Sequence, residues 1–169
     1  FRQGNRYFDQ GKLEEAIEAY NHAIELDPQS FKAHTERGGA YYYQGLFDLA
    51  ITDYTEAIRL NPRDPTGYNN RGGAHFRKQN YQQALANFDQ AIRLNPQLAR
   101  SYYNRGRVYA ALGNYSQAIV DFSTALNLDK HIVKAYNERG LIYLQQQSFD
   151  LAIEDFSRAI ELDPFFPPP

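Results

Sequence analysis

A spacing of 34 residues runs through the whole sequence and limits its fold more than any other feature. Proline, glycine, two columns of alanine and one column of Tyr or Phe all recur at this step. The columns are Pro28, Pro62, Pro96 and Pro164, with Lys130 in the one missing place; Gly4, Gly38, Gly72, Gly106 and Gly140; Ala16, Ala50, Ala84, Ala118 and Ala152; Ala23, Ala57, Ala91, Ala125 and Ala159; and Tyr20, Tyr54, Phe88, Phe122 and Phe156. Such a repeat is too short to bury its own apolar face, so neighbouring repeats must stack.

This pattern resembles the tetratricopeptide repeat (TPR). The resemblance implies an all-α fold, a right-handed α-solenoid of antiparallel helix pairs in which the first helix of each pair lines a concave groove. We expect a TPR domain over residues 1–166, made of a partial repeat at 1–30, whole repeats at 31–64, 65–98, 99–132 and 133–166, and a proline tail at 167–169. The partial first repeat, and a tail that cannot continue a helix, suggest a fragment of a longer TPR array.

The second repeat shows how each helix pair should begin and end. Its first helix is expected over Lys32 to Gln44, and Gly45 then supplies the left-handed residue that ends it. Asp48 is expected to cap the second helix. That helix should end near Leu60, because Pro62 prevents its continuation.

One polar column predicts ion pairs inside the repeats. The arginines that precede the repeating glycine are Arg37, Arg71, Arg105 and Arg139, and sixteen residues later stand Asp53, Asn87, Asp121 and Asp155. The partial repeat lacks both members, with Gln3 and Ala19 in their places. Because arginine is present only where its partner is polar, we predict a structural bond within each repeat rather than a ligand-binding role.

The resemblance places a peptide-binding groove on particular first-helix positions. The candidate groove residues are Lys32, Tyr42, Tyr43, Asn70, Phe76, Arg100, Tyr103, Asn104, Arg107 and Lys134. Basic residues exceed acidic ones at these positions, so an acidic segment or a carboxylate is a candidate ligand. Asn70 and Asn104 could hydrogen-bond to a peptide backbone, as in the asparagine ladder of long TPR superhelices, or serve only as surface polar residues. The aromatic residues could contact a ligand or belong to the core.

Other classes of function receive little support. The formal net charge is −2, which does not favour nucleic acid, and no apolar run is long enough for a membrane span. There is no cysteine, and His22, His34, His75 and His131 have no metal-ligand spacing. We therefore expect no cofactor, no metal and no enzyme activity. The compartment is not fixed, with a soluble, cytoplasmic chain slightly favoured.

Three functions compatible with this reading remain. The leading hypothesis is a protein-protein interaction scaffold that binds an extended peptide or partner protein in its concave groove. An alternative is a self-assembling structural TPR module, because uncovered apolar ends could associate with another copy. The chain could also be the recognition arm of a larger enzyme. No register of the repeats supplies the full set of side chains with which chaperone-tail-binding TPR domains hold their ligand.

Overall fold

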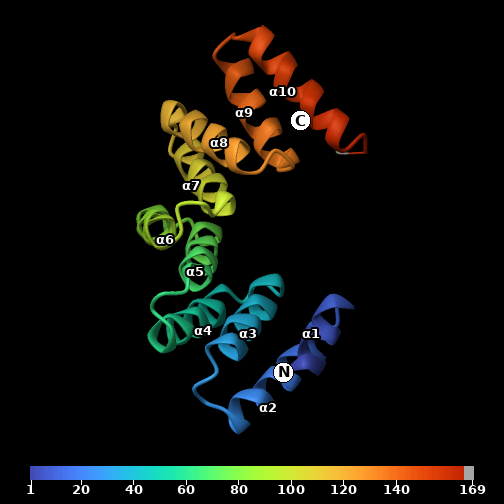
Figure 1. Ribbon diagram of the computed structural model, residues 1–169, viewed down its shortest axis with the longest axis vertical. Helices are drawn as coiled ribbons and strands as arrows, with labels where there is room; N and C mark the ends of the chain where they lie inside the picture. The colour runs from blue at the N-terminus through green and yellow to red at the C-terminus, as the bar shows by residue number, and fades with distance from the viewer. Residues whose placement is uncertain (166–169) are drawn as a thin grey trace. The chain divides into compact units, whose positions relative to one another are not determined.

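The computed structural model describes residues 1–165, and ten α-helices and no strands occur in that range. The helices are α1 Arg2–Asp9, α2 Leu13–Leu26, α3 Phe31–Tyr43, α4 Phe47–Leu60, α5 Pro65–Arg77, α6 Tyr81–Leu94, α7 Ala99–Ala111, α8 Tyr115–Leu128, α9 Val133–Gln145 and α10 Phe149–Leu162. Consecutive helices form antiparallel pairs (Figure 1), so the predicted all-α class is confirmed. Phe166 and the predicted proline tail at 167–169 lie outside the described residues.

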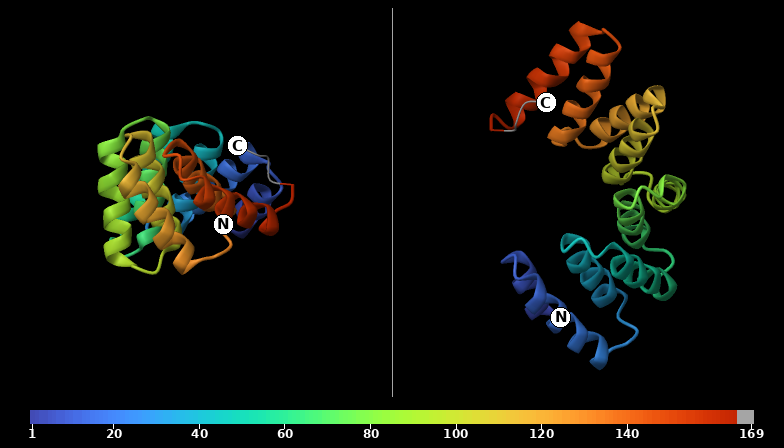
Figure 2. Two further views of the ribbon diagram at one scale, coloured as in Figure 1. Left: turned by 90° about the horizontal axis from the view of Figure 1, so that it is seen from above. Right: turned by 180° about the vertical axis from the view of Figure 1, so that it is seen from behind.

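The chain divides into two compact bodies. The N-terminal body is Phe1–Leu94 and holds three helix pairs, α1/α2, α3/α4 and α5/α6; the C-terminal body begins at Asn95 and holds α7/α8 and α9/α10. Figure 2 shows the same pairs from two further sides. In each body, every pair packs against the pair that follows it in sequence, with α4 against α5 and α8 against α9.

The tight turn inside each helix pair requires a left-handed backbone. Gly11, Gly45 and Gly113 supply it with φ between 73° and 79°, as the sequence predicts for Gly45. Gln79 and Gln147 hold the same conformation at φ 60° and 59°, although they carry side chains. A residue other than glycine is strained in this region, so two of the five turns are less stable than they could be.

The helix ends show one cap that the sequence reading misplaced. Asp64 is the N-cap of α5, where its side chain accepts a hydrogen bond from the Thr66 amide at 2.9 Å ahead of Pro65. Asp48 does not cap α4, because the N-cap is Leu46. Asp48 lies in the first turn of α4 instead and pairs with Lys78, at the end of α5. Its carboxylate therefore links two helix pairs rather than capping the N-terminus of α4.

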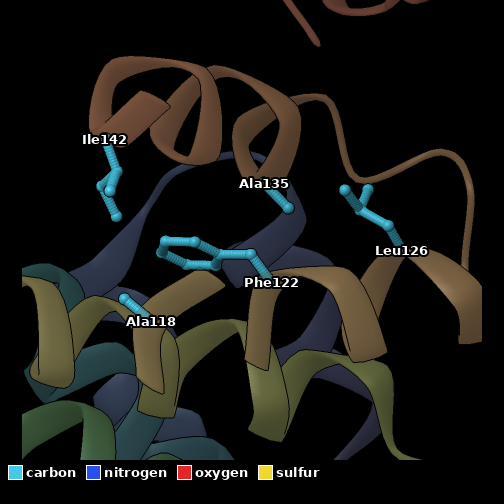
Figure 3. Packing of buried hydrophobic residues seen from close by; sticks show 5 residues of the cluster. All are labelled: Ala118, Phe122, Leu126, Ala135 and Ile142. Atoms are coloured by element: carbon cyan, nitrogen blue, oxygen red, sulfur yellow. The ribbon is translucent and has the colours of Figure 1, made fainter. Parts of the chain in front are cut away.

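Small and aromatic residues from the repeating columns form the core. In the C-terminal body, Phe122 of α8 is fully buried, and its ring lies beneath α9 between Ile142 and Ala135 (Figure 3). A Cβ atom added to Gly106 would approach this ring to 2.8 Å. The glycine column is therefore needed for the close approach of the two helices in a pair.

The predicted arginine pairs are confirmed in all four whole repeats. In the last repeat, the Arg139 Nε and Nη2 atoms donate to the two oxygens of Asp155 at 2.8 and 2.7 Å. Arg37 and Asp53 make the same two-point contact, as do Arg105 and Asp121. Arg71 makes a single bond, from Nε to the Asn87 amide oxygen at 2.8 Å.

The same arginines also connect neighbouring helix pairs, which the sequence reading did not anticipate. The third guanidinium nitrogen of Arg139 donates to Ser123 Oγ of the preceding repeat at 2.7 Å. Arg37 reaches Asn21 and Arg71 reaches Thr55 in the equivalent way. Each of these three side chains therefore fixes the geometry within its own pair and between two pairs.

Candidate functional site

An aromatic cluster in the N-terminal body is formed by side chains of α1, α3 and the first residue of α4, with an arginine of α5 beside them. The Phe8 and Tyr43 rings meet edge to face with centroids 5.4 Å apart, and Tyr42 and Tyr43 are 5.7 Å apart. The Arg77 guanidinium lies over the rings of Tyr42 and Phe47, at 5.7 and 4.9 Å. Contacts of this kind restrict the conformations of the aromatic side chains.

The two predicted tyrosines of this cluster have different surroundings. Tyr43 is 69% exposed, whereas Tyr42 packs against the buried cluster around Tyr54. The structure thus places the two rings in contact, but only Tyr43 has most of its side chain exposed. Exposed aromatic side chains held by other rings are typical of contact surfaces.

The other candidates in the N-terminal body are more scattered. Lys32 is exposed near the ring of Phe31, and Phe76 is half-buried against Tyr81. Asn70 is half-buried, and its Oδ1 atom accepts a hydrogen bond from Asn69 at 3.2 Å. Its own amide N–H groups are then what Asn70 could offer to a ligand.

In the C-terminal body, three first-helix residues form one polar cluster. The Tyr103 hydroxyl donates to Glu138 Oε1 at 3.0 Å, and Arg107 Nε lies 3.2 Å from the same oxygen. Burial raises the pKa of Glu138, while Arg107 and the Tyr103 hydrogen bond oppose that rise. Burial, followed by the charge of Glu138, also raises the pKa of Tyr103. Arg107 is therefore engaged with a carboxylate of the protein itself.

The remaining candidates of the C-terminal body are Arg100, Asn104 and Lys134. Arg100 and Lys134 are exposed on α7 and α9, and neither is in a salt bridge within the described residues. Asn104 is half-buried on α7 and is already in contact with other groups. Asn70 belongs to the N-terminal body and Asn104 to the C-terminal body.

Charge is distributed unevenly over the first helices. Glu36 of α3 is half-buried, and burial followed by the charge of Asp9 on α1 raises its pKa. These two carboxylates lie in the same body as the aromatic cluster. Acidic as well as basic side chains are therefore present on the first helices of this body.

The sequence analysis did not single out one polar group of this body, the hydroxyl of Tyr54. In the partial repeat, the equivalent Tyr20 donates its hydroxyl to Asn5 Oδ1 at 3.0 Å. The residue in the place of Asn5 beside Tyr54 is Gly39, which has no side chain to accept a hydrogen bond. The sequence could have indicated this unpaired hydroxyl, because Tyr54 stands in a column that also contains Phe, while Gly39 stands in the place of Asn5.

Neither a membrane span nor a metal centre is found in the part of the chain that the structure describes. None of the helices within residues 1–165 is long and apolar enough to cross a membrane. No group of three or more His, Asp or Glu side chains that could hold a metal occurs over the same range.

Family models for the TPR match successive parts of the chain. A model described as TPR repeat matches residues 4–45, and models described as tetratricopeptide repeat match 40–99, 72–135 and 133–166. Stacked helix pairs with small residues at their crossings define a helical repeat protein with the architecture of a protein-interaction scaffold. The chain belongs to the tetratricopeptide repeat family.

Several solved structures share this fold along nearly the whole chain. A crystal structure of MamA is 27% identical, with a TM-score of 0.81 over 95% of this chain and 94% of the other. TTC0263, a thermophilic TPR protein in Thermus thermophilus, is 24% identical with a TM-score of 0.83, covering 98% and 90%. YrrB, described as a TPR protein with an unusual peptide-binding site, is 21% identical with a TM-score of 0.71, covering 96% and 84%. No curated protein matches the chain.

Proposed function

We propose that this chain is an interaction module that binds an extended peptide along its first helices. The observation that carries the proposal is the exposed ring of Tyr43, held between Phe8 and Tyr42. A large aromatic surface of this kind contributes more to binding than most side chains and loses little conformational entropy when it is already fixed. The peptide-binding description of YrrB, a protein of the same fold, is consistent with this use.

The test compares Tyr43→Ser with a matched change outside the first helices. Leu26 is 75% exposed at the end of α2, so Leu26→Ser removes a similarly exposed apolar side chain from a second helix. Peptides selected from a random library on the wild-type chain should bind Tyr43→Ser at least about tenfold more weakly and Leu26→Ser equally well. Failure of any peptide to bind the wild type would refute the proposal. Equal loss in both variants would show that binding does not use the first helices.

For the C-terminal body we infer an acidic ligand group. Arg100 and Lys134 are exposed cations, whereas Arg107 already contacts Glu138. Rim charges of this kind mainly affect association rates and salt dependence. Charge reversal of both residues should slow binding of an acidic peptide and reduce its salt dependence. Lys130→Glu, in the loop before α9, is the control that should change neither.

A second candidate function is self-assembly through α10, and its exposed face favours it. Ile160 is 60% exposed, whereas the equivalent Ile58 and Leu126 are 9% and 5% exposed because the following helix covers them. Ser157 occupies the place of Ser123, which accepts the bond from Arg139. The outward side of α10 thus has the composition of a surface between repeats.

Sedimentation at several concentrations tests this second candidate. Self-assembly through α10 should produce dimers or larger species at micromolar concentration, and Ile160→Glu should return them to monomers. A monomer at every concentration would refute it and leave peptide binding unaffected.

A further inference from the structure

The Tyr54 side chain combines nearly complete burial with an unpaired hydroxyl group. The residue is 3% exposed, and its ring packs beneath Gly38, where an added Cβ atom would lie 2.8 Å from Cε1. Within residues 1–165 no side chain or backbone group forms a hydrogen bond with the hydroxyl. Among residues 1–165, His75 Nδ1 is the one fully buried side-chain polar atom without a hydrogen-bond partner, so the Tyr54 oxygen itself is not sealed from solvent. The ring is therefore fixed by packing while its hydroxyl remains accessible as a hydrogen-bond donor.

The hydroxyl points toward the surface of α3 at Gly39. A Cβ atom added to Gly39 would lie 4.0 Å from the Tyr54 oxygen, and Gly39 itself is partly exposed. In the partial repeat the same position holds Asn5, which accepts the equivalent hydroxyl of Tyr20. The second repeat therefore retains the donor of this pair and lacks the acceptor.

The surface around this hydroxyl has little side-chain cover. Gly73 follows Gly39 by one repeat length, on α5, and a Cβ atom added there would have no atom within 4 Å. The helices α3 and α5 are in contact, so the two bare positions belong to neighbouring helices of one body. A ligand can approach the backbone of both helices closely, which favours a main chain over a bulky side chain.

A hydrogen-bond acceptor lies on the same face of α3. Glu36 precedes Gly39 by three residues, a spacing that places both on one side of a helix. Glu36 is half-buried, and within the described residues no donor forms a hydrogen bond with its carboxylate. The Tyr54 hydroxyl of α4, which reaches α3 at Gly39, is thus a donor, and the Glu36 carboxylate on the same side of α3 is an acceptor. A peptide backbone requires both kinds of group.

We propose that Tyr54, Gly39 and Glu36 form a subsite for the main chain of an extended peptide, whose carbonyl accepts from the Tyr54 hydroxyl and whose amide donates to Glu36. The inference rests on the proposed peptide-binding function and specifies where in the N-terminal body it occurs. It also explains why a tyrosine occupies a column that is phenylalanine in the last three repeats. Recognition of a main chain at this point is independent of the ligand's side chains.

Two variants remove the subsite in different ways. Tyr54→Phe deletes only the hydroxyl, and its tolerance in the fold is expected because Phe88, Phe122 and Phe156 fill the same column. Gly39→Asn supplies the missing internal acceptor, as Asn5 does for Tyr20, and also covers the bare backbone. The matched control is Tyr20→Phe, the same change at a hydroxyl that is already paired within the protein.

The probe is the tightest-binding peptide selected from a random library on the wild-type chain, with affinities measured by isothermal titration and folding checked by circular dichroism. Tyr54→Phe should weaken binding about three- to tenfold, the value of one hydrogen bond. Gly39→Asn should weaken it by at least as much, and Tyr20→Phe should leave it unchanged. Wild-type affinity in both Tyr54→Phe and Gly39→Asn would refute the subsite while leaving peptide binding intact. A wild-type chain that binds no peptide would refute both.

Discussion

Removal of one member of the Arg139–Asp155 pair should destabilise the chain far more than removal of both. The Asp155 side chain is 4% exposed and accepts two hydrogen bonds from Arg139, whose own side chain is 17% exposed. Arg139→Met retains most of the aliphatic stem but leaves the carboxylate buried and unpaired. Breaking a buried pair in this way costs about 3–5 kcal/mol.

The double variant Arg139→Met/Asp155→Leu separates the strength of the pair from the cost of an unpaired charge. Because both charges are then absent, most of the lost stability should return, to within about 1 kcal/mol of the wild type. The Ser123 hydroxyl loses its bond from Arg139 but remains half-buried and can bind water. The cycle is completed by Asp155→Leu alone. The losses of unfolding free energy in the two single variants should together exceed the loss in the double variant by about 2 kcal/mol or more.

Urea unfolding followed by circular dichroism measures these differences, with the slope of each transition checked because repeat arrays can unfold in parts. Arg158 and Glu161 are the control pair: they are joined at 2.7 Å on α10 but are largely exposed, so Arg158→Met should not move the midpoint measurably. A single variant as stable as the wild type would refute the claim that burial makes this pair structurally important. A double variant as unstable as Arg139→Met would refute the unpaired-charge explanation.

Three further outcomes follow from strained or titrating residues. Gln147→Gly should stabilise the chain by about 1 kcal/mol in thermal unfolding, because Gln147 holds φ 59° in a turn where three other repeats have glycine. An unchanged melting temperature would contradict this. Burial, followed by the charges of Arg71 and Lys78, lowers the pKa of His75. The stability that the neutral His75 side chain contributes at higher pH is therefore lost as the pH falls through that lowered pKa. His75→Tyr should therefore gain stability over the wild type at about pH 5 more than at about pH 8. Burial raises the pKa of Glu36, so stability present at low pH is lost as the pH rises through the raised pKa, and Glu36→Gln should be more stable relative to wild type at about pH 7 than at about pH 4. A pH-independent difference in either variant would refute the assigned cause.

The fold and part of its polar framework could be predicted from the sequence, because the relevant information repeats. A residue type that recurs at 34-residue steps can be compared with its equivalents, and one exception is then informative. The partial repeat with Gln3 and Ala19 identified the arginine bonds, and the structure confirms the bonds to Asp53, Asn87, Asp121 and Asp155. Hydrogen bonds to the preceding repeat could not be predicted, since they depend on how helix pairs pack.

The sequence alone determined the helix pairs, the glycine turns and the columns that form the core, because these follow from local backbone preferences and periodic burial. Only the tertiary structure decided what each first-helix side chain can still offer to a ligand. Tyr42 and Tyr43 are neighbours of the same type, yet packing buries much of one and leaves the other exposed. Arg107 is occupied by Glu138, and the Tyr54 hydroxyl has no partner within the described chain because Gly39 stands where an asparagine could have accepted it. Each outcome depends on distances between residues that are far apart in the chain. The residue types found at one position of the repeat do not specify these distances.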